Sequence, residues 1–173
     1  MITCDDPVLG RWAKRVLRRL PAVSGGPIRI ERTHGLRDRR GPVHAGSFLR
    51  ERRIAFDCTR AEFPRIFVHE LFHFVWLRLG NRRRLEFEGL LMADRCTGEL
   101  GWSAEWRRKA LSGADVRSRT RRWREYCCES FCDTAAWMYS GTADHPEFSL
   151  CRKSRAVRRE WFRKALENRS LSI

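Results

Sequence analysis

Three polar residues interrupt an apolar segment of this chain, and their types and spacing could support metal-dependent hydrolysis. His69 and His73 lie four positions apart within RIFVHELFHFVWLRLG, residues 65–80. On a helix, both rings project from one face and can bind the same cation. Glu70 is rotated from that face by about 100°, which suits a general base acting on a water at the metal. Burying these groups without partners costs several kcal/mol, so a bound cation explains them better than a histidine pair satisfied by nearby carboxylates.

A tetrahedral zinc site needs a third protein ligand in addition to two histidines. The longer motif HExxHxxGxxH is absent, because Trp76 and Leu79 stand where its glycine and last histidine belong. The candidates are therefore the acidic residues downstream, namely Glu86, Glu88, Asp94, Glu99, Glu105, Glu125, Glu129 and Asp133. Only Glu129 and Asp133 form a pair at helical spacing inside a mostly apolar stretch. Glu129 can bind the metal, and Asp133 can accept a hydrogen bond from the other ring nitrogen of a ligating histidine. Glu99 and Glu105 are the reserves.

Local signals predict the elements that must position these residues. Pro64 starts a helix over 64–79, and Gly80 ends it in a left-handed conformation. Alternating apolar residues around 28–30 and 53–58 indicate a small sheet within 28–58. Asp5 or Asp6 is expected to cap a helix over 6–20, with Pro7 at its first position. Further helices are expected at 103–111, at 115–140 with Asp115 as cap, and at 150–168, whereas 81–102 is ambiguous.

These elements predict an α+β fold in a single domain, residues 1–173. We expect a small, mostly antiparallel sheet packed on the histidine helix and on the helix that carries Glu129, with extra helices at both ends. The seven cysteines are irregularly spaced and no export signal precedes them, which favours reduced thiols, few or no disulfides and a cytoplasmic location. Cys128 and Cys132 could hold a soft metal, although buried apolar packing is the favoured interpretation. No apolar run is long enough to cross a membrane.

The motif HELFH, followed by a helix with ExxxD, resembles the gluzincin zinc peptidases. The small sheet, the strand RIAFDC at 53–58 and the histidine helix directly after it are most similar to the minigluzincins and the ImmA/IrrE-type regulatory peptidases. The resemblance covers about residues 28–141. It implies Zn²⁺ held by His69, His73 and Glu129, with Glu70 as base and Asp133 supporting a ligand. The implied activity is endopeptidase hydrolysis of a protein or peptide substrate.

Two accessory features of such an enzyme are also expected. A donor for the oxyanion is needed besides the metal; His145 and Tyr139 are the first candidates, with His34 and His44 less favoured. The strand that ends at Asp57 resembles the edge strand on which these enzymes lay an extended substrate.

The net charge of +15, with 32 arginines and 4 lysines, supports an alternative class of function. Basic stretches with interleaved tryptophan at 117–124 and 151–164 are typical of nucleic-acid-binding faces. In that reading, the protein is a regulatory nucleic-acid binder whose metal site is structural or degenerate. Arginine bias from a GC-rich genome explains the charge equally well, and Glu70 favours an enzyme, because a structural metal site has no use for a base.

Overall fold

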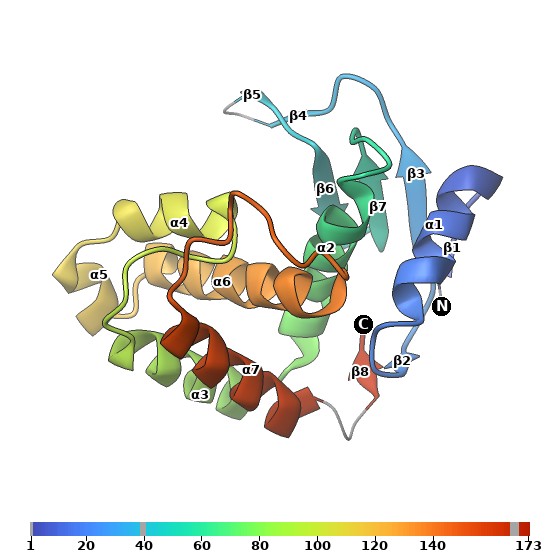
Figure 1. Ribbon diagram of the computed structural model, residues 1–173. Coiled ribbons are helices and arrows are strands. Elements are labelled where there is room, and N and C mark those ends of the chain that lie inside the picture. Colours follow the sequence, from blue (N-terminus) through green and yellow to red (C-terminus); the bar gives the residue numbers. More distant parts are fainter. Residues whose placement is uncertain (1, 39–40, 167–169) are drawn as a thin grey trace.

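The computed structural model describes residues 2–38, 41–166 and 170–173, with most strands in the first third of the chain and most helices after them (Figure 1). The helices are α1 (Pro7–Leu17), α2 (Phe63–Arg78), α3 (Asn81–Ala93), α4 (Trp102–Lys109), α5 (Gly113–Arg117), α6 (Arg121–Tyr139) and α7 (Arg152–Leu166). The strands are β1 (Ile2–Thr3), β2 (Val23–Ser24), β3 (Ile28–Arg32), β4 (Arg37–Asp38), β5 (Gly41–Pro42), β6 (Ala45–Phe48), β7 (Arg53–Phe56) and β8 (Leu171–Ser172). The α+β fold class predicted from the sequence is confirmed.

The main sheet has the strand order β1-β3-β7-β6, and the prediction that it is mostly antiparallel is wrong. β1 pairs with β3 in parallel, β3 pairs with β7 in parallel, and only β6 runs antiparallel to its neighbour β7. Parallel neighbours require a crossover connection, which α1 supplies between β1 and β3. Ile54, Ala55 and Phe56 are all buried, as expected for a central strand covered on both faces.

The position of β7 also corrects the prediction about the edge strand. β7 lies between β3 and β6, so it has no open edge, and β6 is the strand at that end of the sheet. β6 and β7 are consecutive strands that pair in antiparallel fashion. Their sequences alone do not show which of the two lies at the edge of the sheet.

Helix α2 lies between the sheet and α6, which explains its nearly uniform apolar character (Figure 1). Most of its side chains are buried. One face of α2 packs against α1 and β6, and another packs against α6. Phe131 of α6 packs against both Phe72 and Trp76 of α2, with ring centroids 5.7 and 5.1 Å apart, and against Phe162 of α7 at 4.9 Å. This aromatic cluster fixes α2 and α6 relative to each other.

Several predicted helix boundaries agree with the structure. Asp6 caps α1, because its carboxylate accepts hydrogen bonds from the backbone N–H groups of Val8 and Leu9 at 2.7 and 3.1 Å. α1 ends at Leu17, earlier than the predicted residue 20. Gly80 follows α2 with φ +80°, a backbone conformation that favours glycine, but its ψ of 154° is not that of the predicted left-handed helical stop. The predicted end of the last helix at residue 168 lies outside the described residues.

The predicted single helix over 115–140 is wrong, because α5 and α6 replace it. Ser112 caps α5 and Asp115 sits three residues later in a reciprocal capping box, so Asp115 is not the cap. Arg119 then adopts φ +46°, and Thr120 begins α6 by accepting a hydrogen bond from the N–H of Trp123. The backbone N–H of Ser118 closes α5, and the side chain of Thr120 starts α6 two residues later.

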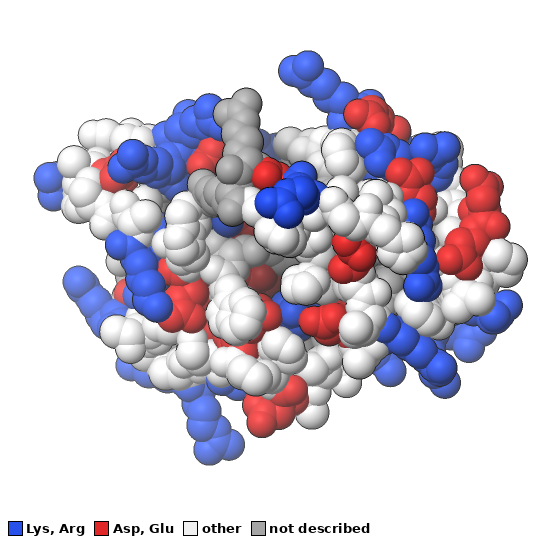
Figure 2. Space-filling view, turned by 90° about the horizontal axis from the view of Figure 1, so that it is seen from above, with Lys and Arg blue, Asp and Glu red and all other residues white. Residues whose placement is uncertain are grey.

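Charged side chains are widely distributed over the face seen in Figure 2. Lysine and arginine lie mainly around its periphery, with aspartate and glutamate among them, and the face is hollowed near its centre. Among the described residues, no helix combines the length and apolar character needed for a membrane span.

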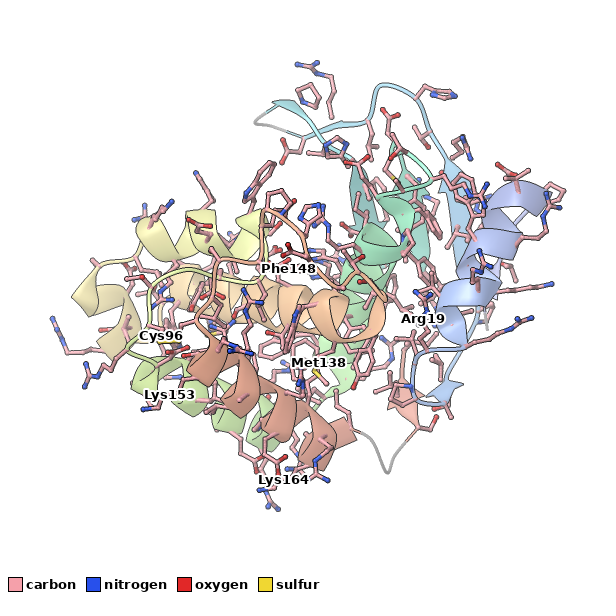
Figure 3. All side chains as sticks on the ribbon, in the orientation of Figure 1. Arg19, Cys96, Met138, Phe148, Lys153 and Lys164 are labelled. Carbon is pink, nitrogen blue, oxygen red and sulfur yellow. A yellow bond between two sulfur atoms is a disulfide. The ribbon has the colours of Figure 1, made fainter. Side chains whose placement is uncertain are left out.

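Two long-range connections hold the helical layer together. Arg158 of α7 is fully buried and its guanidinium lies 2.6 Å from a carboxylate oxygen of buried Glu99. Cys96 and Cys151 form a disulfide, so the expectation of reduced thiols is wrong for these two cysteines, and the described residues contain one disulfide where few or none were expected. Figure 3 shows Arg19 beside the end of α6, where it donates a hydrogen bond to the backbone carbonyl of Ser140.

Candidate metal centre

His69 and His73 face the same side of α2, one helical turn apart. Their ring centroids are 5.0 Å apart and the rings are nearly perpendicular, at 77°. His69 is 8% exposed, whereas His73 is partly accessible. The burial of α2 therefore brings two imidazoles to the boundary with α6, where acidic side chains can reach them.

Asp133 of α6 sets the orientation of His69. Its Oδ1 lies 2.7 Å from Nδ1 of His69, and its Oδ2 accepts a hydrogen bond from the backbone N–H of Ala104 at 3.0 Å. Gly101 makes this approach possible, because a Cβ there would lie 2.3 Å from the carboxyl carbon of Asp133. With the proton held on Nδ1, the lone pair of the neutral ring is on Nε2 and is available to a cation.

Glu129, one turn before Asp133, lies at the other nitrogen of His69. Its Oε2 is 3.3 Å from Nε2 of His69. A tetrahedral zinc ion with bonds near 2.1 Å holds nitrogen and oxygen ligands about 3.4 Å apart. Single donor atoms of His69, His73 and Glu129 all lie within 4.8 Å of one another. The three side chains therefore fit a divalent zinc-type cation in both donor chemistry and spacing.

Positive charge surrounds Glu129 and keeps it ionised. Burial raises the pKa of Glu129, but the hydrogen bond from His69 and the charges of His73, His69 and Arg107 outweigh it and hold the pKa at about 2. The guanidinium of Arg107 is 2.9 Å from Oε1 of Glu129, which leaves Oε2 directed at His69. Arg107 comes from α4 and was not among the residues predicted from the sequence.

The two histidines are flanked by acceptors and therefore hold protons strongly without a cation. Burial lowers the pKa of His69, but the carboxylates of Asp133 and Glu129 outweigh it and raise the pKa well above its ordinary value. Burial also opposes protonation of His73, yet the contact with Cys128 and the charge of Glu129 raise the pKa of His73 to about 9. Nδ1 of His73 is 3.4 Å from the sulfur of Cys128.

Glu70 is held by the edge strand of the sheet. The hydroxyl of Ser47 in β6 lies 2.6 Å from Oε2 of Glu70 and 2.9 Å from its backbone carbonyl oxygen, and it can donate to one of them at a time. Ser47 links the strand to the candidate base. Nothing in the local sequence around Ser47 predicts this contact.

A cavity of about 280 Å³ opens onto His69, Glu70 and Asp133, whereas His73 and Glu129 are not part of its lining. Its walls come from the β5–β6 segment, α2, the start of α4 and the loop before α7. The lining residues are Pro42, Val43, His44, Ala45, Arg65, Ile66, His69, Glu70, Trp102, Ser103, Asp133 and Glu147. Trp102 is 65% exposed at this cavity, an unusual position for a large aromatic side chain.

Glu147 fixes the loop that closes one side of the cavity. Its two carboxylate oxygens lie 2.9 and 3.0 Å from the guanidinium of Arg65 in α2. One of them also accepts a hydrogen bond from the backbone N–H of Trp102 at 3.1 Å. These bonds fix α2, the start of α4 and the loop before α7 relative to one another.

The reserve ligands lie elsewhere in the described structure. Glu99 is fully buried with Arg158 and Tyr126, and Glu105 pairs with Lys109 on the surface of α4. Neither belongs to a group of described residues whose spacing suits a metal ion. The geometry therefore favours Glu129 over both.

Of the four candidate oxyanion donors, only His44 lines the cavity among the described residues. Tyr139 is buried and stacks on Phe72, with ring centroids 5.7 Å apart. His145 lies behind Glu147, with Nδ1 3.9 Å from Oε1, and His34 is 88% exposed beside Asp57. The positions of the side chains therefore favour His44, which the sequence ranked below His145 and Tyr139.

Comparison of the chain with protein-family models, curated proteins and solved structures gave no match. The site is therefore interpreted from its geometry and chemistry.

Proposed function

We propose that the protein is a zinc-dependent peptidase of the gluzincin type, with His69, His73 and Glu129 as the metal ligands. The single observation that carries this proposal is the convergence of two imidazoles and a carboxylate within 4.8 Å, with one of the imidazoles, His69, on a cavity that Glu70 also lines. Three protein ligands with a position left open to solvent are the arrangement of catalytic zinc sites.

The chain's own residues support each proton transfer in peptide hydrolysis. When bound, zinc supplies a polarised water and a Lewis acid for the substrate carbonyl. Glu70 takes up the proton that the attacking water loses and delivers it to the nitrogen of the leaving amine, so the carboxylate is regenerated. Ser47 donates to Oε2 of Glu70, which leaves Oε1 to carry the proton. Asp133 holds the proton on Nδ1 of His69 throughout.

Strand β6 suits an extended peptide substrate. It has a neighbour on only one side, and Ala45 at its start lines the cavity beside Glu70. A peptide that pairs with the open edge of β6 is carried past the candidate metal ligands. His44, next to Ala45, is then the available donor to the oxyanion, and Trp102 offers an apolar wall to a substrate side chain.

The nucleic-acid-binding alternative gains no specific support from the basic stretch at 151–164. Several of its arginines are used within the fold: Arg158 is buried against Glu99, Arg155 donates to the backbone carbonyls of Leu150 and Phe148, and Arg163 pairs with Glu160. These contacts explain much of the basic pattern as structural.

The Glu70→Gln variant tests the proposed peptidase activity. Glutamine keeps the hydrogen bond from Ser47 but cannot take up a proton, so we expect hydrolysis of unfolded protein substrates to fall by about 10²–10⁴-fold. Zinc content should be unchanged, because Glu70 is not a ligand in the proposal. Glu51→Gln, at an exposed carboxylate near the other end of β6, is the matched control and should keep full activity. Equal activity of the Glu70 variant and the wild type would refute the proposal.

A further inference from the structure

His73 also belongs to a second group of potential metal ligands, and the two cysteines of this group have no role in the proposed peptidase. Single donor atoms of His73, Cys128 and Cys132 lie within 4.8 Å of one another. The two cysteines are on successive turns of α6, so their side chains lie on the same face. The sulfur of Cys128 is 3.4 Å from Nδ1 of His73.

The spacing of this second group matches a thiolate metal site. A tetrahedral zinc ion, with a bond near 2.3 Å to sulfur and 2.1 Å to nitrogen, separates these two ligands by about 3.6 Å. Two cysteines and one histidine are also a known donor set for zinc, and soft cations prefer thiolates over carboxylates. Cys132 is buried, but Cys128 and His73 are partly accessible, which gives a cation a way in.

Apolar packing alone does not require these three side chains to face one another. Cys127, the neighbour of Cys128, is fully buried in the core and belongs to neither group of potential ligands among the described residues. Cys4 and Cys58 are likewise free thiols outside both groups. The distinguishing feature of Cys128 and Cys132 is therefore their common approach to one ring nitrogen of His73.

We propose that His73, Cys128 and Cys132 form a second site that binds a soft, thiophilic cation and competes with the first site for His73. A neutral imidazole has one lone pair, so His73 serves one of the two sites at a time. A thiophilic cation bound at the cysteines removes His73 from His69 and Glu129. Metal binding by the second ligand set does not depend on the peptidase proposal, because the set contains neither Glu70 nor Glu129, whereas the competition for His73 rests on that proposal.

Cadmium titration of the metal-free Glu129→Gln variant tests the second site directly. This variant lacks the proposed carboxylate ligand of the first site but keeps both thiols. We expect one equivalent of Cd²⁺ to produce the ultraviolet charge-transfer absorption of a cadmium–thiolate bond, in this variant as in the wild type. Cys128→Ser and Cys132→Ala should each weaken binding by at least about tenfold, as loss of a metal ligand requires. Cys58→Ser, a partly buried free thiol outside the group, is the matched control and should leave the titration unchanged.

Two results would overturn the proposal. One is the absence of thiolate absorption in the wild type at equimolar Cd²⁺. The other is a titration that Cys128→Ser leaves unaltered, and this outcome decides the matter even if substitution of the buried Cys132 prevents folding. This titration measures absorption by the bound metal and does not depend on enzymatic activity. If the zinc-loaded wild type proved inactive, the peptidase proposal would fail, but the test of the second site would still be decided by the titration.

Discussion

Replacing Asp133 with asparagine isolates the hydrogen bond that orients His69. The carboxylate accepts from two donors, Nδ1 of His69 at 2.7 Å and the backbone N–H of Ala104 at 3.0 Å. Asparagine keeps the shape but offers only one accepting oxygen, while its amide nitrogen is a donor. Either His69 must move its proton to Nε2, the nitrogen that faces Glu129, or the N–H of Ala104 meets another donor.

Both arrangements of the asparagine have a cost that can be measured. Loss of a residue that orients a ligating histidine weakens metal binding by about 10–100-fold, which corresponds to about 1.4–2.7 kcal/mol. A buried donor left without an acceptor costs about 1–3 kcal/mol of stability. For a chain of this size, the latter lowers the melting temperature by roughly 2–12 °C.

Two assays separate the effects of Asp133→Asn. Competition with a chromophoric chelator gives the zinc dissociation constant, and thermal unfolding in EDTA gives the stability of the metal-free protein. Glu125→Gln, at an exposed position two turns earlier on α6, is the matched control and should change neither quantity. If Asp133→Asn binds zinc within twofold of the wild type, Asp133 does not support a metal ligand and the reasoning fails.

Three further predictions concern the base, the ionisable groups and the buried ion pair. Ser47→Ala removes the hydrogen bond to Glu70. Because losing a hydrogen bond to a charged group has an effect of about this size, kcat/KM for peptide hydrolysis should fall about tenfold. Unchanged kinetics would rule out a role for Ser47. The metal-free protein should lose stability as pH rises above 6.5, because the carboxylates of Asp133 and Glu129 outweigh burial and raise the folded pKa of His69, and as pH falls from 4.5 through about 2, because Glu129 has a lowered pKa; denaturant titration across pH checks both limbs, and a flat profile contradicts them. Arg158→Ala removes the closest charged partner of buried Glu99, which keeps Tyr126 and a longer contact to Arg108, and should destabilise the protein by about 3–5 kcal/mol. Urea unfolding against the exposed control Arg152→Ala measures this; similar values for the two variants would contradict the buried pair.

The sequence was sufficient for those parts of the site that depend on a single helix. The four-residue interval between His69 and His73 has geometric meaning on its own, since any helix places both rings on one face. The same reasoning identified Glu129 and Asp133 as a pair on another helix. Capping signals located the start of α1 and the end of α2, because these contacts are local.

Features that depend on pairing between distant segments could not be read from the sequence. The parallel register of β3 and β7 depends on how the connecting residues cross over, and alternation within each strand does not specify it. Ser47 and Arg107 reach Glu70 and Glu129 from β6 and α4, elements whose positions follow only from the assembled core. The buried run of Ile54, Ala55 and Phe56 was the one local sign that β7 is central.

The break between α5 and α6 has a different cause. Only Ser118 and Thr120 mark the junction in the sequence, within the basic segment 117–122. Serine and threonine occur in helix interiors as well as at caps, so their presence does not decide between one helix and two. The positive φ of Arg119 is a consequence of the junction and is not visible beforehand.

The zinc affinity of Glu129→Gln, compared with Glu125→Gln, tests the central claim most directly. Both variants are best measured in a Cys128→Ser background, so that thiolates do not bind the metal in place of the carboxylate. If Glu129 is a ligand, its substitution should weaken zinc binding by more than the roughly 100-fold seen for supporting residues, and Glu125→Gln should bind as tightly as the parent. Equal zinc affinity in the two variants would contradict a cation held jointly by His69, His73 and Glu129.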